Sequence, residues 1–317
     1  MLVTSAGRKF SGSPDAISRD PSMHSMRRWL VGLLAAFSLS SPTVFAQSRF
    51  VTLGHVDLSI YEVTANVIQG VLERLGYTVA VKKGSHAEIY PLLGKGEVDL
   101  FVAVWLPHAH ASYWEKYKDS SMQVTTLFED ARLFWSVPDY VPAADVSSVA
   151  DLRKPEVAAK MQKEIRGTRP DSGLMIGSKK IMEEYGLGDA GYQLMPGKPA
   201  DWIASFEDNI ASQRWFVMPL YQPQYLNRVA RMRILEEPKQ LLGGIDMAYL
   251  VAHKDFYAKV DKRTWKALQR ISLSVKAVTE MDYLVNVKKL TAQYAARNWM
   301  AAHPDTVNYW LQPDPEE

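Results

Sequence analysis

One short stretch, residues 96–110 with the sequence GEVDLFVAVWLPHAH, constrains the fold of this chain more than any other. Residues 98–106 are apolar apart from Asp99, are too few for a helix of ordinary length, and are followed by Pro107. A short run rich in Val, Phe and Trp predicts a strand that is buried on both faces of a parallel sheet. Ligands bind just outside the carboxyl ends of such strands, and Trp105 lies at this end. Its indole can therefore form a pocket wall, although most tryptophans in such positions belong to the core.

The residues before this strand predict two strand–helix units. Apolar residues recur with helical spacing across residues 60–75, after a Ser59 and Glu62 pair that is typical of a capping box. Gly76 then occupies the position that favours a left-handed backbone at a helix end. The order predicts a parallel βαβαβ unit with right-handed crossovers, completed by strands at residues 50–54 and 77–81 and a helix at 87–93.

The second half of the chain predicts another α/β unit. The chain is expected to cross back near Gly243 and Gly244, and residues from 256 onward are mostly helical in pattern. The elements expected in this half are strands at 132–137, 192–195, 215–220 and 248–252, and helices at 155–165, 170–185 and 199–213.

The composition excludes several classes of protein. The 317 residues provide material for two hydrophobic cores, and the formal net charge is only +2. Lys and Arg are scattered among acidic residues rather than clustered, so we expect no nucleic-acid partner. The chain has no cysteine, which excludes disulfides, cysteine zinc sites, thiol nucleophiles and a lipid-modified cysteine.

Residues 1–46 predict a signal peptide with an upstream extension. A basic Met-Arg-Arg precedes an apolar run at residues 29–39, and small residues precede a cleavage site after Ala46. The apolar run is too short to span a bilayer comfortably. We expect the natural start at Met23 or Met26, and a periplasmic mature protein that has been secreted through the cleaved signal.

No motif for catalysis, cofactor binding or metal binding stands out. Gly186, Gly188 and Gly191 match GxGxxG, but they follow a helical pattern and precede a strand, so they predict a helix end and a turn. His108 and His110 lack the further ligands that a metal site needs, which favours a solvated loop. No phosphate-binding loop, serine hydrolase elbow or catalytic carboxylate pair is present in the sequence. We therefore expect a protein that is not an enzyme, with no cofactor and no metal.

Aromatic residues lie at the ends of expected elements or in short strands, where they can build a binding site. An aromatic face attracts a quaternary ammonium, which cannot donate hydrogen bonds, by ~0.5–2 kcal/mol per contact. The helix start at Ser59 offers backbone N–H groups to a carboxylate. An aromatic cage beside this helix start suits a methylated zwitterion. The aromatic residues are Tyr61, Trp105, Trp135, Trp202, Trp215 and Tyr221, of which Trp202 and Trp215 are interpreted as core.

With these residues considered, the chain resembles the substrate-binding proteins of glycine betaine, choline and carnitine ABC transporters over residues 50–310. The order and spacing of several short motifs carry the resemblance. They are VLERLGY at 71–77, similar to LLExLGY; GEVD at 96–99 with WLP at 105–107, similar to GxxDxxxxxWLP; VPDYV at 137–141; YGL at 185–187; and LEEPK at 235–239, similar to LxDPK.

The resemblance implies an α/β fold of the two-lobed periplasmic binding protein type II, with two α/β sandwich domains joined by a two-crossover hinge. Lobe I would comprise residues 47–133 and 246–317, and lobe II residues 134–245. A ligand would bind between the lobes, which close around it.

The resemblance also implies roles for individual residues. Trp105 matches the cage tryptophan of WLP, and Tyr221 stands where the family's WxPH has tryptophan, with Gln224 where a histidine is usual. Leu58 occupies the place of another cage tryptophan, and Tyr61 is the ring nearest to it. The ligand-binding residues expected in addition are Asp57, Ser59 and Ile60 of the early loop, Ser172 of the Asp-Ser-Gly loop, and Trp135.

The predicted function is that of a periplasmic, monomeric solute-binding protein that hands its ligand to an ABC permease in the inner membrane. The ligand would be a small zwitterion or cation of the glycine betaine, choline and carnitine class. Because leucine stands at position 58, where the family has a tryptophan, the same fold could instead bind another solute, such as an amino acid or an imidazole compound. An exported enzyme or a two-lobed sensor are alternatives from other classes, and the sequence provides no catalytic set for the enzyme.

Overall fold

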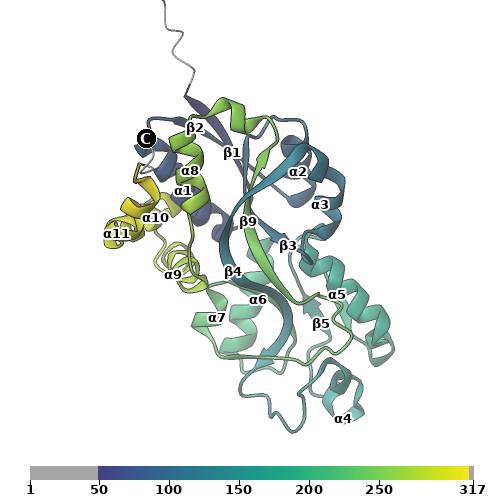
Figure 1. The fold of residues 1–317 in the computed structure, drawn as a ribbon. Coiled ribbons are helices and arrows are strands. Elements are labelled where there is room, and N and C mark those ends of the chain that lie inside the picture. Colours follow the sequence, from purple (N-terminus) through teal and green to yellow (C-terminus); the bar gives the residue numbers. More distant parts are fainter. Residues whose placement is uncertain (1–48, 314–317) are drawn as a thin grey trace, which may run out of the picture. The chain divides into compact units, whose positions relative to one another are not determined.

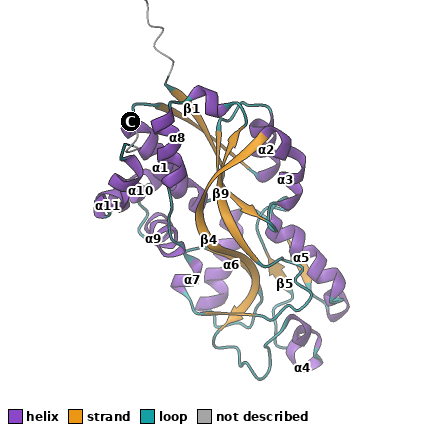
Figure 2. Ribbon diagram, in the orientation of Figure 1, coloured by secondary structure: helices purple, strands orange, loops and turns teal. Residues whose placement is uncertain are grey.

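The computed structural model describes residues 49–313, so the expected signal peptide and start residue lie outside the described residues. Strands and helices alternate through most of this part of the chain (Figures 1 and 2). The strands are β1 (Phe50–Val56), β2 (Thr78–Gly84), β3 (Leu100–Leu106), β4 (Ser121–Pro138), β5 (Glu164–Arg166), β6 (Gln193–Met195), β7 (Met218–Gln222), β8 (Met232–Ile234) and β9 (Ile245–His253). The helices are α1 (Ser59–Arg74), α2 (His86–Gly94), α3 (Ala111–Tyr117), α4 (Pro155–Ala158), α5 (Gly173–Glu184), α6 (Pro199–Ala211), α7 (Leu226–Val229), α8 (Lys262–Arg270), α9 (Val275–Asn286), α10 (Ala292–Ala302) and α11 (Pro304–Leu311).

The larger of the two sheets in the described residues has the strand order β2-β1-β3-β9-β4-β7, and β8 pairs with β4 outside this path. β1 is parallel to both β2 and β3, which confirms the predicted parallel βαβαβ unit. β3 is buried along its whole length, as its apolar run predicted. β9 runs antiparallel to β3 and to β4, so the sheet is mixed.

The two long strands β4 and β9 connect the parallel part of the sheet with the remaining elements. β4 pairs with β9 from Ser121 to Arg132 and with β7 from Arg132 to Ser136. In Figure 1 these strands run side by side from the region of β1, β3 and α2 toward that of α5, α6 and β5. The strand predicted at residues 132–137 is thus the second part of an 18-residue strand. Its first part escaped prediction because register shifts along β9 disturb the usual alternation of apolar and polar residues.

Two local predictions were wrong. The helix expected at residues 155–165 ends at Ala158, because residues 164–166 form β5 and pair in parallel with β6. Ser59 does not cap α1: Leu58 precedes the helix without a side-chain cap, and Ser59 is the first helical residue. The Ser59 hydroxyl instead accepts a hydrogen bond from Asn286 Nδ2 at 2.9 Å. A partner from the distant helix α9 has therefore replaced the local cap.

The predicted turns at glycine are confirmed. Gly76 follows α1 with φ +86°, a left-handed conformation that side chains with a Cβ rarely adopt. Gly186 and Gly191 have φ +57° and +84° and enclose a short turn between α5 and β6. The GxGxxG string is therefore a helix end, as its position after a helical pattern indicated.

Helix α1 is held against the sheet by its apolar face. Val63, Val67, Ile68 and Val71 are fully buried, and each such side chain contributes about 1.5–3 kcal/mol when it is removed from water. This packing fixes the start of α1 directly after the carboxyl end of β1. The loop between them, which holds Leu58, therefore has a defined place beside the end of β3.

Candidate binding cavity

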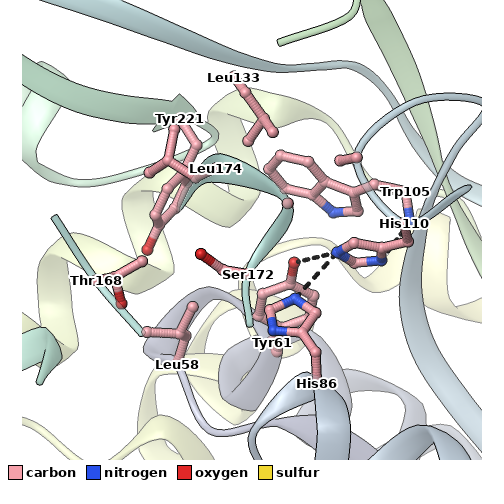
Figure 3. Close-up of a pocket in the computed structure, with 12 residues that line it drawn as sticks. Leu58, Tyr61, His86, Trp105, His110, Leu133, Thr168, Ser172, Leu174 and Tyr221 are labelled. Atoms are coloured by element: carbon pink, nitrogen blue, oxygen red, sulfur yellow. Dashed lines mark hydrogen bonds between the residues drawn. The ribbon is translucent and has the colours of Figure 1, made fainter. Parts of the chain in front are cut away.

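A cavity lies at the carboxyl ends of the parallel strands β1, β2 and β3 (Figure 3). The position agrees with the rule that ligands of parallel sheets bind at the carboxyl ends of strands. The lining residues are Leu58, Tyr61, His86, Trp105, Ala109, His110, Leu133, Thr168, Ser172, Gly173, Leu174 and Tyr221.

Three aromatic rings form one corner of the cavity. The ring centroids of Trp105 and Tyr221 are 6.1 Å apart and the rings are nearly perpendicular, at 78°. Tyr61 also stacks on Trp105, with centroids 6.2 Å apart and an angle of 28°. The indole and the phenol that the sequence analysis expected to meet therefore lie side by side in the cavity wall, as Figure 3 shows.

Tyr221 is held in place by its neighbours. Its strand β7 pairs with β4 so that Tyr221 lies opposite Leu133, and both side chains line the cavity. The ring packs against the indole of Trp202, with centroids 5.7 Å apart. The Tyr221 carbonyl accepts a hydrogen bond from Asn227 Nδ2 at 2.8 Å. Burial raises the pKa of the Tyr221 hydroxyl well above its usual range, so the group stays protonated.

His86 and His110 form a hydrogen-bonded pair in the same wall, with their Nε2 atoms 3.1 Å apart. Burial lowers the pKa of both imidazoles below the usual range, so both are neutral at neutral pH. The Trp105 backbone N–H donates to His110 Nδ1 at 3.0 Å, and the Tyr90 hydroxyl lies 2.8 Å from the same nitrogen.

These contacts assign the proton positions on the two rings. A backbone N–H can only donate, so His110 Nδ1 accepts and the proton of neutral His110 is on Nε2. That Nε2–H donates to His86 Nε2, and His86 therefore carries its own proton on Nδ1. His86, which lines the cavity, thus has an N–H donor on the ring nitrogen that is not bonded to His110.

Further donors are available to a polar ligand group. The Nε1 atom of Trp105 is buried and has no hydrogen-bond partner within residues 49–313. At the start of α1, the N–H groups of Tyr61 and Glu62 donate to the Leu58 carbonyl. The N–H groups of Ser59 and Ile60 belong to the first helical turn, which has no intrahelical acceptors. A carboxylate or hydroxyl in the cavity would meet donors rather than a charged side chain.

Residues 169–173 contact residues 57, 87 and 109 near the cavity. Asp171 Oδ2 accepts a hydrogen bond from the Ala87 N–H, in the first turn of α2, at 2.9 Å. Arg169 forms an ion pair with Asp57 at 3.1 Å. A Cβ atom at Gly173 would overlap the Ala109 carbonyl oxygen, so only glycine permits this close approach.

Half of the expected ligand-binding residues lie in the cavity lining, namely Leu58, Tyr61, Trp105, Ser172 and Tyr221. The other five lie outside the lining. Asp57 is engaged by Arg169 and Lys83, and Trp135 donates from Nε1 to Ser178 Oγ at 2.8 Å. The remaining three are Ser59, Ile60 and Gln224, whose side chain is almost fully buried.

The sequence analysis missed the two histidines of the lining. His110 was interpreted as part of a solvated loop, and that interpretation was wrong because its imidazole is buried and hydrogen-bonded. His86 was not among the residues that the sequence analysis proposed for the site. A signal for it existed: it directly follows a strand parallel to β1, so it had to lie at the same sheet edge as Leu58 and Trp105.

The described residues show neither a metal site nor a membrane span. In residues 49–313, no three His, Asp or Glu residues are arranged to hold a metal ion. None of the helices in that range has the length and apolar character needed to cross a bilayer.

Solved structures with the same fold bind small solutes. Lactococcal OpuAC, in a closed-liganded conformation with glycine betaine, aligns over 83% of this chain and 99% of its own, with TM-score 0.74 and 22% identity. The glycine betaine/L-proline-binding protein ProX of Borrelia burgdorferi aligns over 83% and 97%, with TM-score 0.76 and 22% identity. An ABC-transporter choline-binding protein in complex with choline aligns over 83% and 92%, with TM-score 0.73 and 19% identity. These likenesses show that the chain has the α/β fold of these solute-binding proteins, which confirms the predicted fold class.

A family model described as the substrate-binding domain of ABC-type glycine betaine transport systems, OpuAC, matches residues 50–302. The chain belongs to this family, as its motifs predicted, and the family is one of transport proteins rather than enzymes. The glycine betaine/carnitine transport binding protein GbuC of Listeria monocytogenes is 21% identical over 158 residues, or 50% of this chain. That match covers 52% of GbuC, so the chain spans about half the length of this curated relative.

Proposed function

We propose that the protein is the solute-binding component of an ABC transporter and captures a quaternary ammonium or betaine-type molecule in the cavity of Figure 3. The observation that carries the proposal is the corner formed by Trp105, Tyr221 and Tyr61. The ligand would be released unchanged to the transporter, so the protein acts without catalysis.

The aromatic corner suits the methylated cation. A trimethylammonium group has no N–H to donate, and its charge is best stabilised by the faces of aromatic rings, at ~0.5–2 kcal/mol per ring. No carboxylate is part of the cavity lining in residues 49–313. An unmethylated ammonium would therefore lose its hydrogen bonds to water without gaining an anionic acceptor, which favours the methylated class.

The polar end of the ligand would meet neutral donors. The candidate donors are Trp105 Nε1–H, His86 Nδ1–H and the N–H groups of the first turn of α1, which follows Leu58 of the lining. Hydrogen bonds to a charged acceptor are worth about 1.5–3 kcal/mol each. Together these donors replace the histidine that the family usually has at the position of Gln224.

The lobes proposed here are residues 47–133 with 246–317, and residues 134–245. In this division Tyr221 and Ser172 belong to one lobe, and Trp105, Tyr61 and Leu58 to the other. The contacts of Asp171 with Ala87, and of Arg169 with Asp57, would then cross between the lobes when they close on the ligand. The proposed hinge consists of the long strands β4 and β9.

Export to the periplasm as a monomer, and docking on an ABC permease in the inner membrane, complete the proposed function. They follow from the family and from the signal-like pattern of residues 1–46. Fractionation of cells that express the full chain, with sequencing of the mature amino terminus, tests the export. A protein that stays in the cytosol with its first residues intact would contradict it.

A second candidate ligand is an imidazole-containing or amino-acid solute. Leu58 leaves one wall of the cavity aliphatic, and the His86–His110 pair adds polar nitrogens to another. These features would accept a flatter and more polar molecule than a compact trimethylammonium.

Isothermal titration of the mature protein with glycine betaine, choline, carnitine, proline and histidine distinguishes the two classes. The proposal expects binding of at least one methylated ammonium at least a hundredfold tighter than of histidine, a difference of about 2.7 kcal/mol. Binding of histidine or another unmethylated amino acid with the higher affinity would replace the first candidate by the second. A thermal-shift series with the same ligands provides an independent readout, because bound ligand raises the melting temperature by mass action.

A further inference from the structure

Two buried carboxylates, Asp246 and Asp282, lie directly behind the cavity lining. Their exposed fractions are 0% and 1%. Neither forms an ion pair with a Lys or Arg within residues 49–313. A buried carboxylate is costly unless it is compensated, so two unpaired ones near a single cavity call for a physical explanation.

Asp246 lies at the start of β9 and holds the loop that follows β3. Its Oδ1 accepts a hydrogen bond from the His108 N–H at 2.6 Å, and its Oδ2 accepts one from the Ala109 N–H at 3.0 Å. Ala109 is part of the cavity lining. The Asp246 carboxylate thus binds the backbone of a lining residue, and both of its hydrogen-bond donors are neutral.

Asp282 lies on α9 and is hydrogen-bonded to residues from two other segments near the cavity lining. Its Oδ2 accepts a hydrogen bond from the Tyr225 N–H at 2.7 Å, and its Oδ1 accepts one from Asn286 Nδ2 at 2.8 Å. The same Asn286 amide donates to the Ser59 hydroxyl, next to Leu58 of the lining. Every one of these partners is neutral.

The charges of both carboxylates reach the rings of the cavity. The negative charge of Asp246 contributes, after burial, to a raised pKa of the Tyr61 hydroxyl. The charge of Asp282 acts in the same direction on the pKa of Tyr221, again after burial. Each carboxylate therefore lies close enough to act on the hydroxyl of one ring in the cavity lining. The two cations adjacent in sequence to the lining, Arg132 and Arg169, are paired with Asp130 and Asp57 and do not cancel the charge of these carboxylates.

We infer that Asp246 and Asp282 are specificity-determining residues that act through space. Their charges make the electrostatic potential in the cavity negative, so the cavity prefers ligands with a positive charge and orients their cationic end. This inference rests on the proposed function and deepens it. The carboxylates need no contact with the ligand, because charges in a poorly solvated interior interact over several ångströms. Keeping them out of the lining also leaves the methyl groups of the ligand in contact with aromatic and apolar surface only.

The test compares three ligands of nearly equal shape and different charge. Choline carries one positive charge, glycine betaine is a zwitterion, and the tert-butyl analogue of choline, with carbon in place of nitrogen, is uncharged. Dissociation constants for all three are measured by titration calorimetry at neutral pH with the wild-type protein, Asp282→Asn and Asp246→Asn. Asp305→Asn, at an exposed position of α11, is the matched control for the loss of one negative charge.

The inference expects each buried substitution to weaken choline about tenfold and the uncharged analogue less than twofold, with glycine betaine in between. Asparagine can keep only part of the hydrogen bonds that aspartate accepts, so some loss of stability accompanies both variants. The ratio of the dissociation constants for choline and the uncharged analogue within one variant removes that effect, because a loss of folded protein affects the binding of both ligands equally. An unchanged ratio in both variants, or an equal change in Asp305→Asn, would overturn the inference. Failure of the wild-type protein to bind choline or betaine at all would instead refute the proposed function.

Discussion

Replacement of Trp105 by phenylalanine isolates the contribution of the indole to binding. The side chain is 2% exposed, packs between Tyr61 and Tyr221, and presents an Nε1–H without a partner in residues 49–313. Phenylalanine keeps an aromatic face in the same place but is smaller and has no N–H. The substitution therefore removes one hydrogen-bond donor and part of the π surface while leaving a ring in the wall.

The expected magnitude follows from these two losses. A hydrogen bond to a charged acceptor contributes about 1.5–3 kcal/mol, and the weaker π face of phenylalanine adds a few tenths to this. We expect a loss of about 2 kcal/mol of binding free energy, which is roughly a thirtyfold rise in Kd for glycine betaine. Full removal of the ring in Trp105→Ala should cost more, because a cavity then replaces the wall.

Titration calorimetry with glycine betaine measures the change, and thermal unfolding of the ligand-free protein checks that the variant is folded. Trp299→Phe is the matched control, since Trp299 lies on α10 and stacks on Trp310 outside the cavity. A Trp105→Phe protein that binds with unchanged affinity would refute the role assigned to the indole. An equal loss in both variants would show that the effect is one of stability and not of recognition.

Three further predictions follow from single contacts. Gly173→Ala places a Cβ against the Ala109 carbonyl oxygen, so we expect at least a tenfold loss of affinity, whereas Gly188→Ala, which meets nothing within 4 Å, should bind normally in the same titration. His86→Phe keeps a ring but removes the Nδ1–H donor, so glycine betaine should weaken about tenfold and choline, which has no carboxylate, less than threefold; equal losses would contradict the assigned proton position. Burial raises the pKa of Asp282 from 3.8 to about 6, so its ionisation costs about 3 kcal/mol of stability, absent below pH 4 and fully present above pH 6. Denaturant unfolding at pH 5 and pH 7.5 should therefore show a smaller pH dependence in Asp282→Asn than in the wild type.

The sequence places Leu58 and Trp105 on the same side of the cavity, and the reason is physical. Parallel strands deliver their carboxyl ends to one sheet edge, so Leu58 after β1 and Trp105 at the end of β3 had to lie close together. The apolar run that identified β3 is a strong local signal, because burial on both faces leaves almost no alternative composition. The same argument applied to β2 would have identified His86 as well.

The details of hydrogen bonding on that side could not be read from the sequence. Ser59 and Glu62 have the spacing of a capping box, yet the Ser59 hydroxyl bonds to Asn286, more than two hundred residues away in the chain. The imidazole of His110 is likewise held by Tyr90 and by the Trp105 backbone. Local patterns predict local partners, and a buried polar group takes whichever partner the tertiary packing brings within reach.

The opposite wall depends on register, which is a property of strand pairing rather than of a local pattern. Leu133 and Tyr221 meet because they are directly paired residues of the antiparallel strands β4 and β7. A slip of β7 by one residue would turn Tyr221 to the other face of the sheet and remove it from the cavity, away from Leu133. The family resemblance suggested Tyr221 as a cage ring, but only the pairing explains why Leu133 accompanies it. An insertion of one residue in the segment that connects β4 and β7 leaves the pairing of the two strands intact. An insertion within β7 before Tyr221 would shift the pairing and turn Tyr221 away from the cavity. The pairing of β4 with β7 is therefore what places this ring in the binding site.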